Sequence, residues 1–543
     1  MSKIVITNTF CHLSEASSII ISSVSSVLTV KVDGYWFDPR YKKGLWDGTT
    51  SFFDKRNNTF MTGLLPIVMS AMESLDEPVE LIDGRLGMDY LIEPEDLENS
   101  VVVLKHSNKT LRDYQNESIQ NVMNSKILNG IRWQRGILNL ATNAGKTVIA
   151  EGIIQITYPK LGDSYRIHHS DGSLEKIDPV FMFLTHSKEI AYQAKRSFEQ
   201  DLGISVGVVG DGKWDVQSVT IGIIPTLYAR LKGQKPEFYD LAKRVVAFVA
   251  DELHHASSEG YNQVLQNLNT AALRIGLTGT VPKNSDKLLK VKGVTGEIIT
   301  KVSNNYLIKH GYSAKPECYM IPVDYPDVDS IRLYGRTDEY GDLEYNDIYQ
   351  KGIVSNMWRN YIIAKICQKE VEENKGQVLI LVERIEHGEC ITECLDYLNC
   401  GLKYLFLNGE LDSATRQQGL SLLKSGDLDV VISTAILDEG VDVPNINALI
   451  YARGMKSTRK LLQGIGRGLR KKHDGSNLRM YDFIDYTAGV LGAQTVQRME
   501  VLSKEKFSIK QKTTEDFLGI SESEFQSVMA ELDTTYDSKY VNV

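Results

Sequence analysis

The sequence predicts an α/β protein with two parallel-sheet lobes, a small α+β module in front of them and a helical extension behind them. Short apolar runs alternate with helical segments from residue 110 to residue 281, and the same alternation returns between residues 317 and 485. Strands that alternate with helices are typical of parallel sheets covered on both faces. The 543 residues also exceed what a single compact core accommodates.

Residues 1–105 are expected to form the small α+β module. KIVITN (3–8) and LTVKV (28–32) are predicted strands, and the serine-rich residues 14–27 between them are a predicted helix. An aromatic and basic segment, DGYWFDPRYKKGLWDG (33–48), follows the second strand. This module differs in pattern from everything after residue 110.

The two lobes are expected over residues 106–305 and 306–490. The predicted strands of the first lobe are GILNLAT (136–142), FMFLTH (181–186), SVTIGII (218–224), VVAFVADE (245–252) and LRIGLTGT (273–280). Those of the second lobe are ECYMIPV (317–323), QVLILVE (377–383), KYLFLNG (403–409), DVVISTA (429–435), NALIYARG (447–454) and RMYDFID (479–485).

Three segments lie outside this alternation. An Asp-Gly turn flanked by short polar runs predicts a hairpin inserted at residues 160–179. The acidic residues 324–347 are expected to form a solvated loop on the second lobe. Residues 491–543 are expected to form a polar, helical C-terminal extension and tail, in which Arg498, Lys504, Lys506, Lys510 and Lys512 lie close together in the sequence.

Composition excludes several classes of protein. A net charge of −9 and a pI of about 5.7 argue against a basic nucleic-acid coat, so any contact with nucleic acid must be local. Six cysteines in so long a chain give no disulfide framework, which fits a reducing compartment. The apolar runs are far shorter than the ~18 residues that a membrane span needs. We therefore expect a cytoplasmic monomer that makes no contact with a membrane.

The segment ILNLATNAGKTVIA (137–150) predicts a phosphate-binding loop. A strand, a turn that contains Gly145, Lys146 and Thr147, and the start of a helix together provide backbone amides, a cation for the β/γ oxygens and a hydroxyl for Mg²⁺. The match is imperfect, because Leu140 occupies the usual first glycine position and Asn143 replaces another glycine. A chance GKT turn is the alternative, and the remaining motifs argue against it.

A second signal is the apolar strand that ends in DELHH (251–255). A carboxylate at the carboxyl end of a neighbouring parallel strand suits Mg²⁺, and the next acid suits the attacking water. We assign Asp251 to the metal and Glu252 to the water. His254 is expected to couple the nucleotide state to the lobe, whereas His255 is expected on the surface. No matching ligand pair supports a zinc site here, and His387, Cys390 and Cys394 are interpreted as a packed helix face.

The second lobe contributes a candidate arginine finger. LLQGIGRGLRKK places Gln463, Arg467 and Arg470 at spacings that share one face of a helix. A permanently charged guanidinium suits the charge that develops on a transferring γ-phosphoryl group. A solvated basic helix is the alternative. With the phosphate-binding loop in one lobe and these arginines in the other, we expect ATP to bind between the lobes and to drive their closure.

Together these motifs resemble those of the superfamily 2 helicases. LRDYQ (111–115) is similar to the Q motif, ATNAGKT (141–147) to motif I, DELH (251–254) to motif II, LTGT (277–280) to motif III, STAILDEGVDVP (433–444) to motif V and QGIGRGLR (463–470) to motif VI. THSKEIAYQ (185–193) and PTL (225–227) are similar to motifs Ia and Ib. The resemblance implies two RecA-like lobes that use ATP and Mg²⁺.

The resemblance also implies the roles of individual residues. The residues it places at the nucleotide are Gln115, which reads the adenine edge, together with Arg112, Asn143, Ala144, Gly145, Lys146, Thr147, Gly440, Asp442 and Gln463. Thr147 and Asp251 would hold Mg²⁺, while Thr278 and Thr280 would couple hydrolysis to movement. Thr185, Thr226 and Thr434 would line the nucleic-acid backbone.

The front module narrows the resemblance to the UvsW-type branch-migration DNA helicases of phages, through residues 33–48. Six residues there, Tyr35, Trp36, Arg40, Lys42, Lys43 and Trp46, are candidates for binding nucleic acid, because bases stack on rings while cations hold phosphates. Packing of the same rings against the first lobe is the alternative.

The function implied is an ATP-dependent DNA helicase or translocase. It would unwind or branch-migrate forked, junction or single-stranded DNA in phage recombination, replication and repair, in the host cytoplasm. A restriction-type duplex translocase subunit and an RNA helicase share the motor and remain alternatives. A non-catalytic nucleic-acid-binding scaffold is an alternative of another class, against which the intact Lys146, Asp251 and Glu252 argue.

Overall fold

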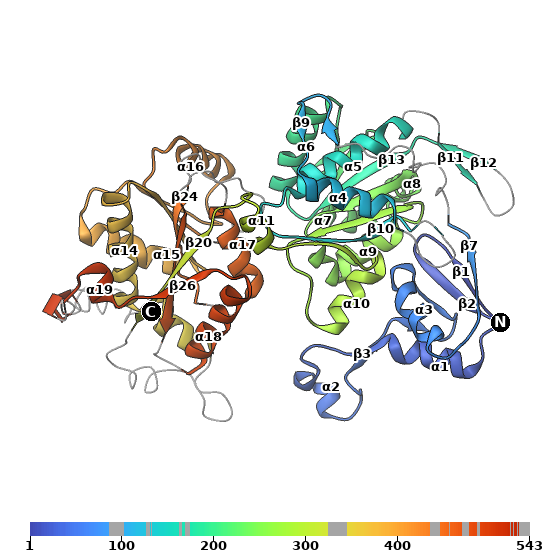
Figure 1. Cartoon of the computed structure of the whole chain (residues 1–543), viewed down its shortest axis with the longest axis horizontal. Helices are drawn as coiled ribbons and strands as arrows, with labels where there is room; N and C mark the ends of the chain where they lie inside the picture. Colours follow the sequence, from blue (N-terminus) through green and yellow to red (C-terminus); the bar gives the residue numbers. More distant parts are fainter. Residues whose placement is uncertain are drawn as a thin grey trace. The chain divides into compact units, whose positions relative to one another are not determined.

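A computed structural model provides the structure of the chain. It describes residues 1–85, 102–125, 131, 133–161, 165–168, 174–323, 345–434, 446–454, 457–469, 477–485, 489–521, 523–524, 526–528 and 530. The chain divides into two compact units, Met1–Val302 and Ser303–Val543. Figure 1 shows both units, each built around a sheet with helices on its faces. None of the helices in the described ranges has the length and apolar character required to cross a bilayer.

The first unit begins with a small mixed sheet in the strand order β5-β6-β2-β1-β7. Its strands are β1 (Ser2–Ile6), β2 (Phe10–Ser14), β5 (Phe53–Asp54), β6 (Thr59–Met61) and β7 (Val79–Asp83). The helices are α1 (Ser18–Val27), α2 (Pro39–Lys42), α3 (Leu65–Glu73) and the 3₁₀ turns η1 (Tyr35–Phe37) and η2 (Thr62–Leu64), and β3 (Thr29–Lys31) pairs with β4 (Thr49–Ser51). The sequence prediction missed β2, because FCHLS follows the first strand after a short turn and was assigned to no element.

The rest of the first unit is an eight-stranded sheet in the order β15-β14-β16-β13-β17-β18-β10-β19. Every pairing in it is parallel except that of β14 with β15. The strands are β10 (Arg135–Leu140), β13 (Val180–Thr185), β14 (Gly207–Gly210), β15 (Lys213–Asp215), β16 (Val219–Ile223), β17 (Val245–Ala250), β18 (Leu273–Thr278) and β19 (Ile298–Val302).

Helices cover both faces of this sheet (Figure 1). They are α4 (Asp113–Met123), α5 (Lys146–Leu161), α6 (Lys188–Leu202), α7 (Ile224–Lys232), α8 (Pro236–Arg244), α9 (Glu259–Asn267), α10 (Ser285–Val294) and the 3₁₀ turn η6 (Leu253–Ser257). Two antiparallel pairs complete the unit: β8 (Val103–Leu104) with β9 (Lys109–Thr110), and β11 (Tyr165–His168) with β12 (Leu174–Ile177). The second pair confirms the hairpin predicted at residues 160–179.

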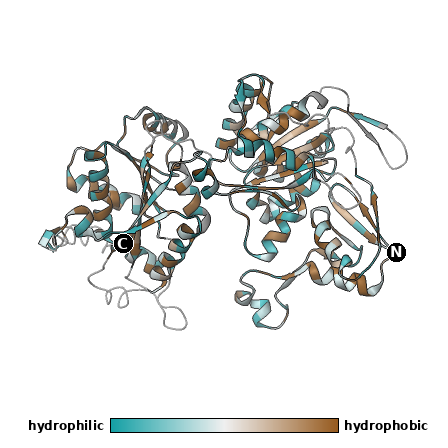
Figure 2. Cartoon of the chain, viewed as in Figure 1, coloured by the Kyte–Doolittle hydropathy of each residue, from teal (hydrophilic) through white to brown (hydrophobic). Residues whose placement is uncertain are grey.

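The central strands are buried on both faces, as their continuous apolar sequences require. All six residues of β17 are buried, and so are all six of β13. Figure 2 shows brown, apolar strands inside helices whose outward residues are teal. Because these strands are buried along their whole length, polar residues of a site can only follow where the strands end.

The small module and the first large sheet share one core. Buried side chains of the module form a single cluster with Trp133, Ile137 and the apolar residues of α10. Gly63 lies so close to α10 that a Cβ there would meet the carbonyl oxygen of Lys292 at 2.0 Å. Asn8 adds two long-range hydrogen bonds: its Nδ2 donates to the Asn269 carbonyl (3.0 Å), and its carbonyl accepts from Arg135 Nη2 (2.7 Å).

The second unit contains a wholly parallel seven-stranded sheet in the order β22-β23-β21-β24-β25-β20-β26. Its strands are β20 (Pro316–Val323), β21 (Gln377–Leu381), β22 (Tyr404–Leu407), β23 (Val430–Ser433), β24 (Ile446–Tyr451), β25 (Leu478–Asp485) and β26 (Ser508–Gln511). The helices are α11 (Asn304–Lys309), α13 (Tyr345–Tyr349), the π-helical turn η7 (Gln350–Val354), α14 (Met357–Glu372), α15 (Ile385–Leu398), α16 (Ser413–Ser425), α17 (Thr458–Gly468), α18 (Gly489–Lys504) and α19 (Thr514–Leu518). The C-terminal extension is therefore not only helical, because β26 adds an edge strand beside β20.

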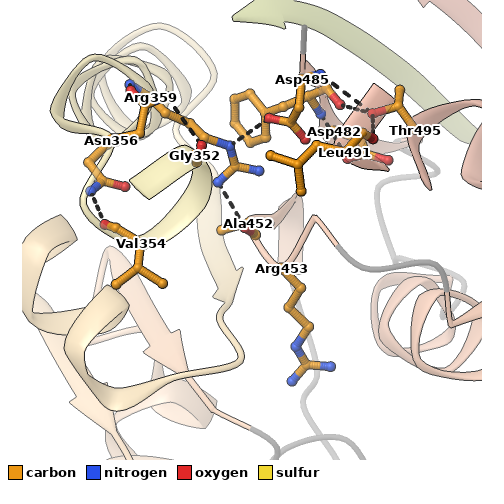
Figure 3. A network of polar contacts seen from close by, with 12 residues as sticks. Gly352, Val354, Asn356, Arg359, Ala452, Arg453, Asp482, Asp485, Leu491 and Thr495 are labelled. Atoms are coloured by element: carbon orange, nitrogen blue, oxygen red, sulfur yellow. Dashed lines mark hydrogen bonds and ion pairs between the residues drawn. The ribbon is translucent and has the colours of Figure 1, made fainter. Parts of the chain in front are cut away.

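A buried ionic network joins the extension to this second sheet (Figure 3). Arg498 Nε donates to Asp482 Oδ2 at 2.8 Å, and Arg359 Nε donates to Asp485 Oδ1 at 3.1 Å. All four side chains are at most 1% exposed. Although the extension is polar in sequence, Arg498 is buried, because its helix packs directly against β25 and the two aspartates compensate the buried charge.

The network yields a stability prediction. Arg498→Met should destabilise the second unit by about 3–5 kcal/mol, because it leaves Asp482 buried without its counter-charge, while Asp485 keeps only Arg359. Thermal unfolding followed by circular dichroism measures the loss. Lys504→Met on the same helix is the matched control, since Lys504 is 74% exposed and should change the melting temperature little. Equal melting temperatures for both variants would contradict the role given to the network.

Candidate active site

The phosphate-binding loop predicted at residues 141–147 joins β10 to α5, as the motif requires. Asn143 and Gly145 both adopt left-handed backbone conformations, with φ of 71° and 76°. Asparagine tolerates this region better than other side chains do, so Asn143 can stand where a glycine was expected. Gly145 is further constrained, because a Cβ there would approach Gln115 Nε2 to 2.4 Å.

The Q-motif residues hold this loop from one side. Gln115 Nε2 and the Tyr114 hydroxyl both donate to the Ala144 carbonyl, at 2.9 and 3.0 Å. Gln115 Oε1 accepts from the Arg112 amide at 2.9 Å, and Arg112 Nη1 donates to the Tyr114 hydroxyl at 3.0 Å. Tyr114 was not among the predicted site residues. Two features of the sequence could have indicated a role for Tyr114. It is adjacent to Gln115, and the glycine-containing phosphate-binding loop needs side chains that hold it in place.

Motifs I, II and III meet at the carboxyl ends of three adjacent strands. The strand β18 lies between β10 and β17 in the sheet, so LTGT falls between the phosphate-binding loop and DELH. Lys146 Nζ donates to Glu252 Oε1 at 2.5 Å, and the two side chains are 19% and 12% exposed. A Cβ at Gly279 would lie 4.0 Å from Lys146 Nζ, which places motif III directly beside the lysine.

A short relay of contacts runs from Glu252 into motif III. Glu252 Oε2 lies 3.3 Å from His254 Nδ1, which in turn lies 3.3 Å from the Thr278 hydroxyl. The Thr278 hydroxyl donates to the Thr280 carbonyl at 2.8 Å. The residues predicted to couple hydrolysis to movement are therefore in contact with one another. Glu252 itself has a left-handed backbone, with φ of 44°, a conformation typical of strained functional sites.

The two acids are in different electrostatic states. Burial raises the pKa of Asp251 to about 6, and the neighbouring Glu252 carboxylate adds to this shift, while Lys146 opposes it. For Glu252, burial alone would raise the pKa, but Lys146 and His254 outweigh it and lower the pKa to about 2. Glu252 is thus ionised at neutral pH and able to accept a hydrogen bond from water.

The acids also fit a divalent cation. Asp251 Oδ1 is buried and has no hydrogen-bond partner among the described residues. A buried carboxylate oxygen without a partner is costly unless a cation or water satisfies it. Asp251 and the hydroxyl of Thr147, which lies in the first turn of α5, are the residues that could hold Mg²⁺ here.

Three histidines stack beside this site. The ring of His255 lies 4.1 Å from that of His186 and 4.2 Å from that of His254, centroid to centroid. His255 was expected on the surface, but it is half-buried between the other two rings. His186 directly follows Thr185, which is fully buried at the end of β13, so motif Ia lies next to motif II.

The remaining predicted residues are distributed as follows. Thr226 is half-buried in the first turn of α7. In the second unit, Thr434 follows β23 and Gln463 is 9% exposed in α17. Arg467 belongs to α17, but its side chain lies outside the described residues, as do Gly440, Asp442 and Arg470. Most of the predicted acidic loop, residues 324–344, also lies outside them.

The second unit contains a further charged cluster that sequence reasoning did not predict. Glu383, just after β21, pairs with Lys460 in the first turn of α17, and its Oε2 lies 3.7 Å from Arg453 Nε. Figure 3 shows the Arg453 side chain extending away from the network, while the preceding Ala452 carbonyl is held by Arg359 Nη1 at 2.8 Å. His387, Cys390 and Cys394 are all buried, as a packed helix face requires, and no metal-binding cluster occurs in the described residues.

Comparisons with known protein families give the two halves of a motor in order. Residues 108–283 match the family "Type III restriction enzyme, res subunit", and residues 361–472 match the "Helicase conserved C-terminal domain". The chain is a superfamily 2 helicase. Members of this superfamily hydrolyse ATP, and this helicase keeps the lysine and the two acids that such hydrolysis needs.

Individual relatives agree with the family assignment. This helicase is 24% identical over 468 residues to the "ATP-dependent DNA helicase uvsW" of Enterobacteria phage T4, covering 85% of this chain and 86% of the relative. It is 23% identical to the "DNA 3'-5' translocase XPB2" of Sulfurisphaera tokodaii, covering 67% and 79% of the two chains. A solved fragment of a putative HsdR subunit of a type I restriction enzyme from Vibrio vulnificus shares the fold, with a TM-score of 0.54, 18% identity and coverage of 78% and 71%. These findings confirm the predicted fold of two RecA-like sheets with a small N-terminal mixed sheet.

A buried carboxyl behind the phosphate-binding loop yields a pH prediction. Glu151, on α5, accepts a hydrogen bond from the Ser197 hydroxyl at 2.5 Å and is fully buried. Burial raises its pKa to about 7, and the nearby Asp201 adds to the shift. The unfolded chain releases this proton near its ordinary value of about 4.5, so the folded state loses stability as the pH rises from about 4.5 to 7.

Glu151→Gln should remove this penalty. The variant should match the wild type at pH 5 and exceed it at pH 8 by up to about 3 kcal/mol, since each pKa unit corresponds to about 1.4 kcal/mol. Melting temperatures at the two pH values measure the difference. Glu189→Gln on the neighbouring α6 is the control, because Glu189 is exposed. A Glu151→Gln variant with the same gain at both pH values would contradict the assignment.

Proposed function

We propose that this helicase is an ATP-driven DNA motor that unwinds or branch-migrates forked and junction DNA. The observation that carries the proposal is the extent of the likeness to the phage T4 relative. That likeness covers 85% of this chain, whereas the two motor families run only from residue 108 to residue 472. It therefore extends outside the motor, into regions that a generic translocase does not need.

Each step of hydrolysis has a candidate group in the first unit. Lys146 and the backbone amides of the loop bind the β- and γ-phosphates, and bound Mg²⁺ supplies further positive charge there. Glu252 orients the attacking water, because it is ionised and lies against Lys146. The residues proposed to complete the nucleotide site are Gln115, Arg112, Asn143, Gly440, Asp442 and Gln463. Two arginines, Arg467 and Arg470, are proposed to contact the γ-phosphate.

Conversion of hydrolysis into movement is proposed to use the relay from Glu252 through His254 to Thr278. Loss of the γ-phosphate changes what Glu252 and Lys146 contact, and the relay carries this change to Thr280. Thr226 and Thr434 are proposed to hold the DNA backbone, whereas Thr185, which was predicted to do so as well, is fully buried and cannot contact it directly. A motor that moves along any sequence contacts mostly phosphates, so its affinity for DNA should fall steeply with salt.

The proposed substrate is tested by offering the full-length protein a panel of matched substrates. The panel contains a four-way junction with homologous arms, a fork, a blunt duplex of the same length and an RNA duplex, each followed by gel analysis with and without ATP. The proposal predicts ATP-dependent conversion of the junction and the fork, with little action on the blunt duplex or the RNA. Preferential action on RNA would support an RNA helicase, and movement along blunt duplex without strand separation would support a restriction-type translocase.

A further inference from the structure

The arm between β3 and β4 carries large apolar side chains in solvent. Within this aromatic loop (residues 33–48), Phe37 is 72% exposed and Leu45 is 76% exposed, and Trp36 is 51% exposed. Isolated apolar residues on a surface are common, but three such side chains within ten residues of one short arm form a patch. Figure 1 shows β3 leading to α2 at the end of an arm that extends away from the β1–β2–β7 sheet.

The other aromatic residues of the loop hold its shape. The Trp46 indole nitrogen donates to the Thr49 carbonyl at 2.8 Å, and Arg40 lies over the Trp46 ring at 5.0 Å. Tyr35 packs edge-on against Tyr41, with ring centroids 4.7 Å apart. The aromatic residues of the loop therefore divide into two groups: Tyr35 and Trp46 are half-buried supports, whereas Trp36 and Phe37 face solvent.

The backbone of the loop is also fixed. Asp38 caps α2 by accepting from the Arg40 amide at 2.8 Å, and its second oxygen binds the Arg40 guanidinium at 2.8 Å. Gly48 has a φ of 79°, and a Cβ there would meet the Tyr35 ring at 2.5 Å. A short arm tied at both ends presents its tip without a large entropic cost on binding.

The charge next to the tip is positive. Arg40 is neutralised by Asp38, and Asp33 is paired with Lys287 at 3.0 Å. Lys42 and Lys43 are exposed and form no ion pair with any described residue. A hollow of about 630 Å³ lies between Trp36, Tyr41, Lys42 and Trp46 beside Leu45. Flat apolar faces next to two unpaired cations complement a nucleobase and its phosphate better than they complement a neutral protein surface.

The arm is connected to the ATPase motifs through α10. Lys287, which binds Asp33 at the base of the arm, lies in the first turn of α10, shortly after motif III. Asn262 Nδ2 donates both to the Ala256 carbonyl of η6, which directly follows Glu252, at 2.9 Å, and to the Lys290 carbonyl of α10, at 3.1 Å. Packed elements of one compact unit therefore form a continuous path from motifs II and III to the arm.

We propose that Phe37 and Leu45 form a strand-separating pin that stacks on the last intact base pair of a DNA junction, while Lys42 and Lys43 hold the phosphates beside it. Stacking on an aromatic ring is worth about 1–3 kcal/mol per base and does not depend on sequence, as a motor requires. The pin rests on the proposed DNA motor function, which it deepens by assigning the residues that part the strands.

The test compares Phe37→Ala/Leu45→Ala with Ile19→Ala/Leu75→Ala in the full-length protein. The second pair is the matched control, because Ile19 and Leu75 are exposed apolar residues of the same module, 71% and 43% exposed, outside the aromatic loop. The first measurement is the number of base pairs separated per ATP hydrolysed on a fork at saturating DNA. This ratio should fall at least tenfold in the pin variant and stay at the wild-type value in the control.

A second measurement needs no ATP. Stacking quenches the fluorescence of 2-aminopurine, so a 2-aminopurine placed at the last base pair of the fork should dim when the wild type binds and should dim much less with the pin variant. Lys42→Ala/Lys43→Ala should weaken binding to the fork and reduce the dependence of that binding on salt. If DNA did not change the ATP turnover of the wild type, the proposed motor function would be refuted. The 2-aminopurine measurement, which needs no ATP, would still test the proposed pin.

Two results would overturn the pin. The first is a separation ratio and a 2-aminopurine signal that are the same in the pin variant and the control. The second is an equal fluorescence change when 2-aminopurine is moved far into the unpaired strand, which would identify a general stacking platform. A loop that serves as a docking site for a protein would leave both measurements unaffected and would also contradict the proposal.

Discussion

Lys146→Ala should reduce ATP turnover to below about 1% of the wild-type rate, because removal of a preorganised charge at a transferring phosphoryl group costs at least 10²-fold. The lysine lies between the phosphate-binding loop, Glu252 and motif III, so no other described cation can take its place. Steady-state ATP hydrolysis measures the loss. Far-ultraviolet circular dichroism should show that the variant is folded.

Lys243→Ala is the matched control for this variant. Lys243 belongs to α8 in the same unit and is exposed, just before the start of β17, whereas the site lies beyond the end of that strand. Its replacement should leave turnover within error of the wild type. Substantial hydrolysis by Lys146→Ala would mean that residues 141–147 do not bind the triphosphate.

Glu252→Gln should lower kcat by about 10²–10⁴-fold while ATP still binds, because it removes the group that orients water and leaves the phosphate-binding loop intact. Glutamine keeps the size of the side chain but not its negative charge. Nucleotide binding, followed with a fluorescent ATP analogue, should therefore persist while turnover stops. The difference between binding and turnover separates this variant from a folding defect.

Glu259→Gln serves as the control for Glu252→Gln. Glu259 is an exposed acid at the start of α9, only seven residues further along the chain. Its variant should hydrolyse ATP normally. If Glu252→Gln also kept its kcat, the ionised carboxylate beside Lys146 would have no part in activating water.

The strands that carry the motor motifs were predictable because they are buried on both faces. Continuous apolar runs such as VVAFVA have no other stable place in a protein of this composition. Two of the strands that the prediction missed, β19 and β26, lie at sheet edges. Edge strands need only one apolar face, so their sequences resemble loops.

Packing between distant segments was less predictable. The sequence pattern distinguishes residues 1–105 as a module but does not show that it shares a core with the first large sheet. Gly63 lies against the carbonyl of Lys292, and deletion of the module would expose this shared core. Point substitutions in the aromatic loop therefore test its role better than a truncation does. Likewise, the sequence around Arg498 does not reveal that this residue of α18 lies against two aspartates of β25.

The sequence predicted the active-site residues that the chemistry of ATP hydrolysis requires. It did not predict the residues that only hold those groups in place. Lys146, Asp251 and Glu252 follow from the needs of a triphosphate and Mg²⁺, and the structure brings Lys146 and Glu252 into contact. Tyr114 and His255 act through neighbours that are distant in sequence or stacked in space, so a linear pattern does not identify them.

The central claim is that ATP hydrolysis at Lys146 and Glu252 is coupled to movement on DNA. The most direct measurement is the ATP turnover of the full-length protein with no nucleic acid and then with single-stranded DNA, duplex, fork, four-way junction and RNA, in parallel with Glu252→Gln. We predict turnover that rises at least about tenfold with DNA, most with the branched substrates, and that disappears in the variant. A wild-type rate that is the same with and without every DNA substrate would contradict the account.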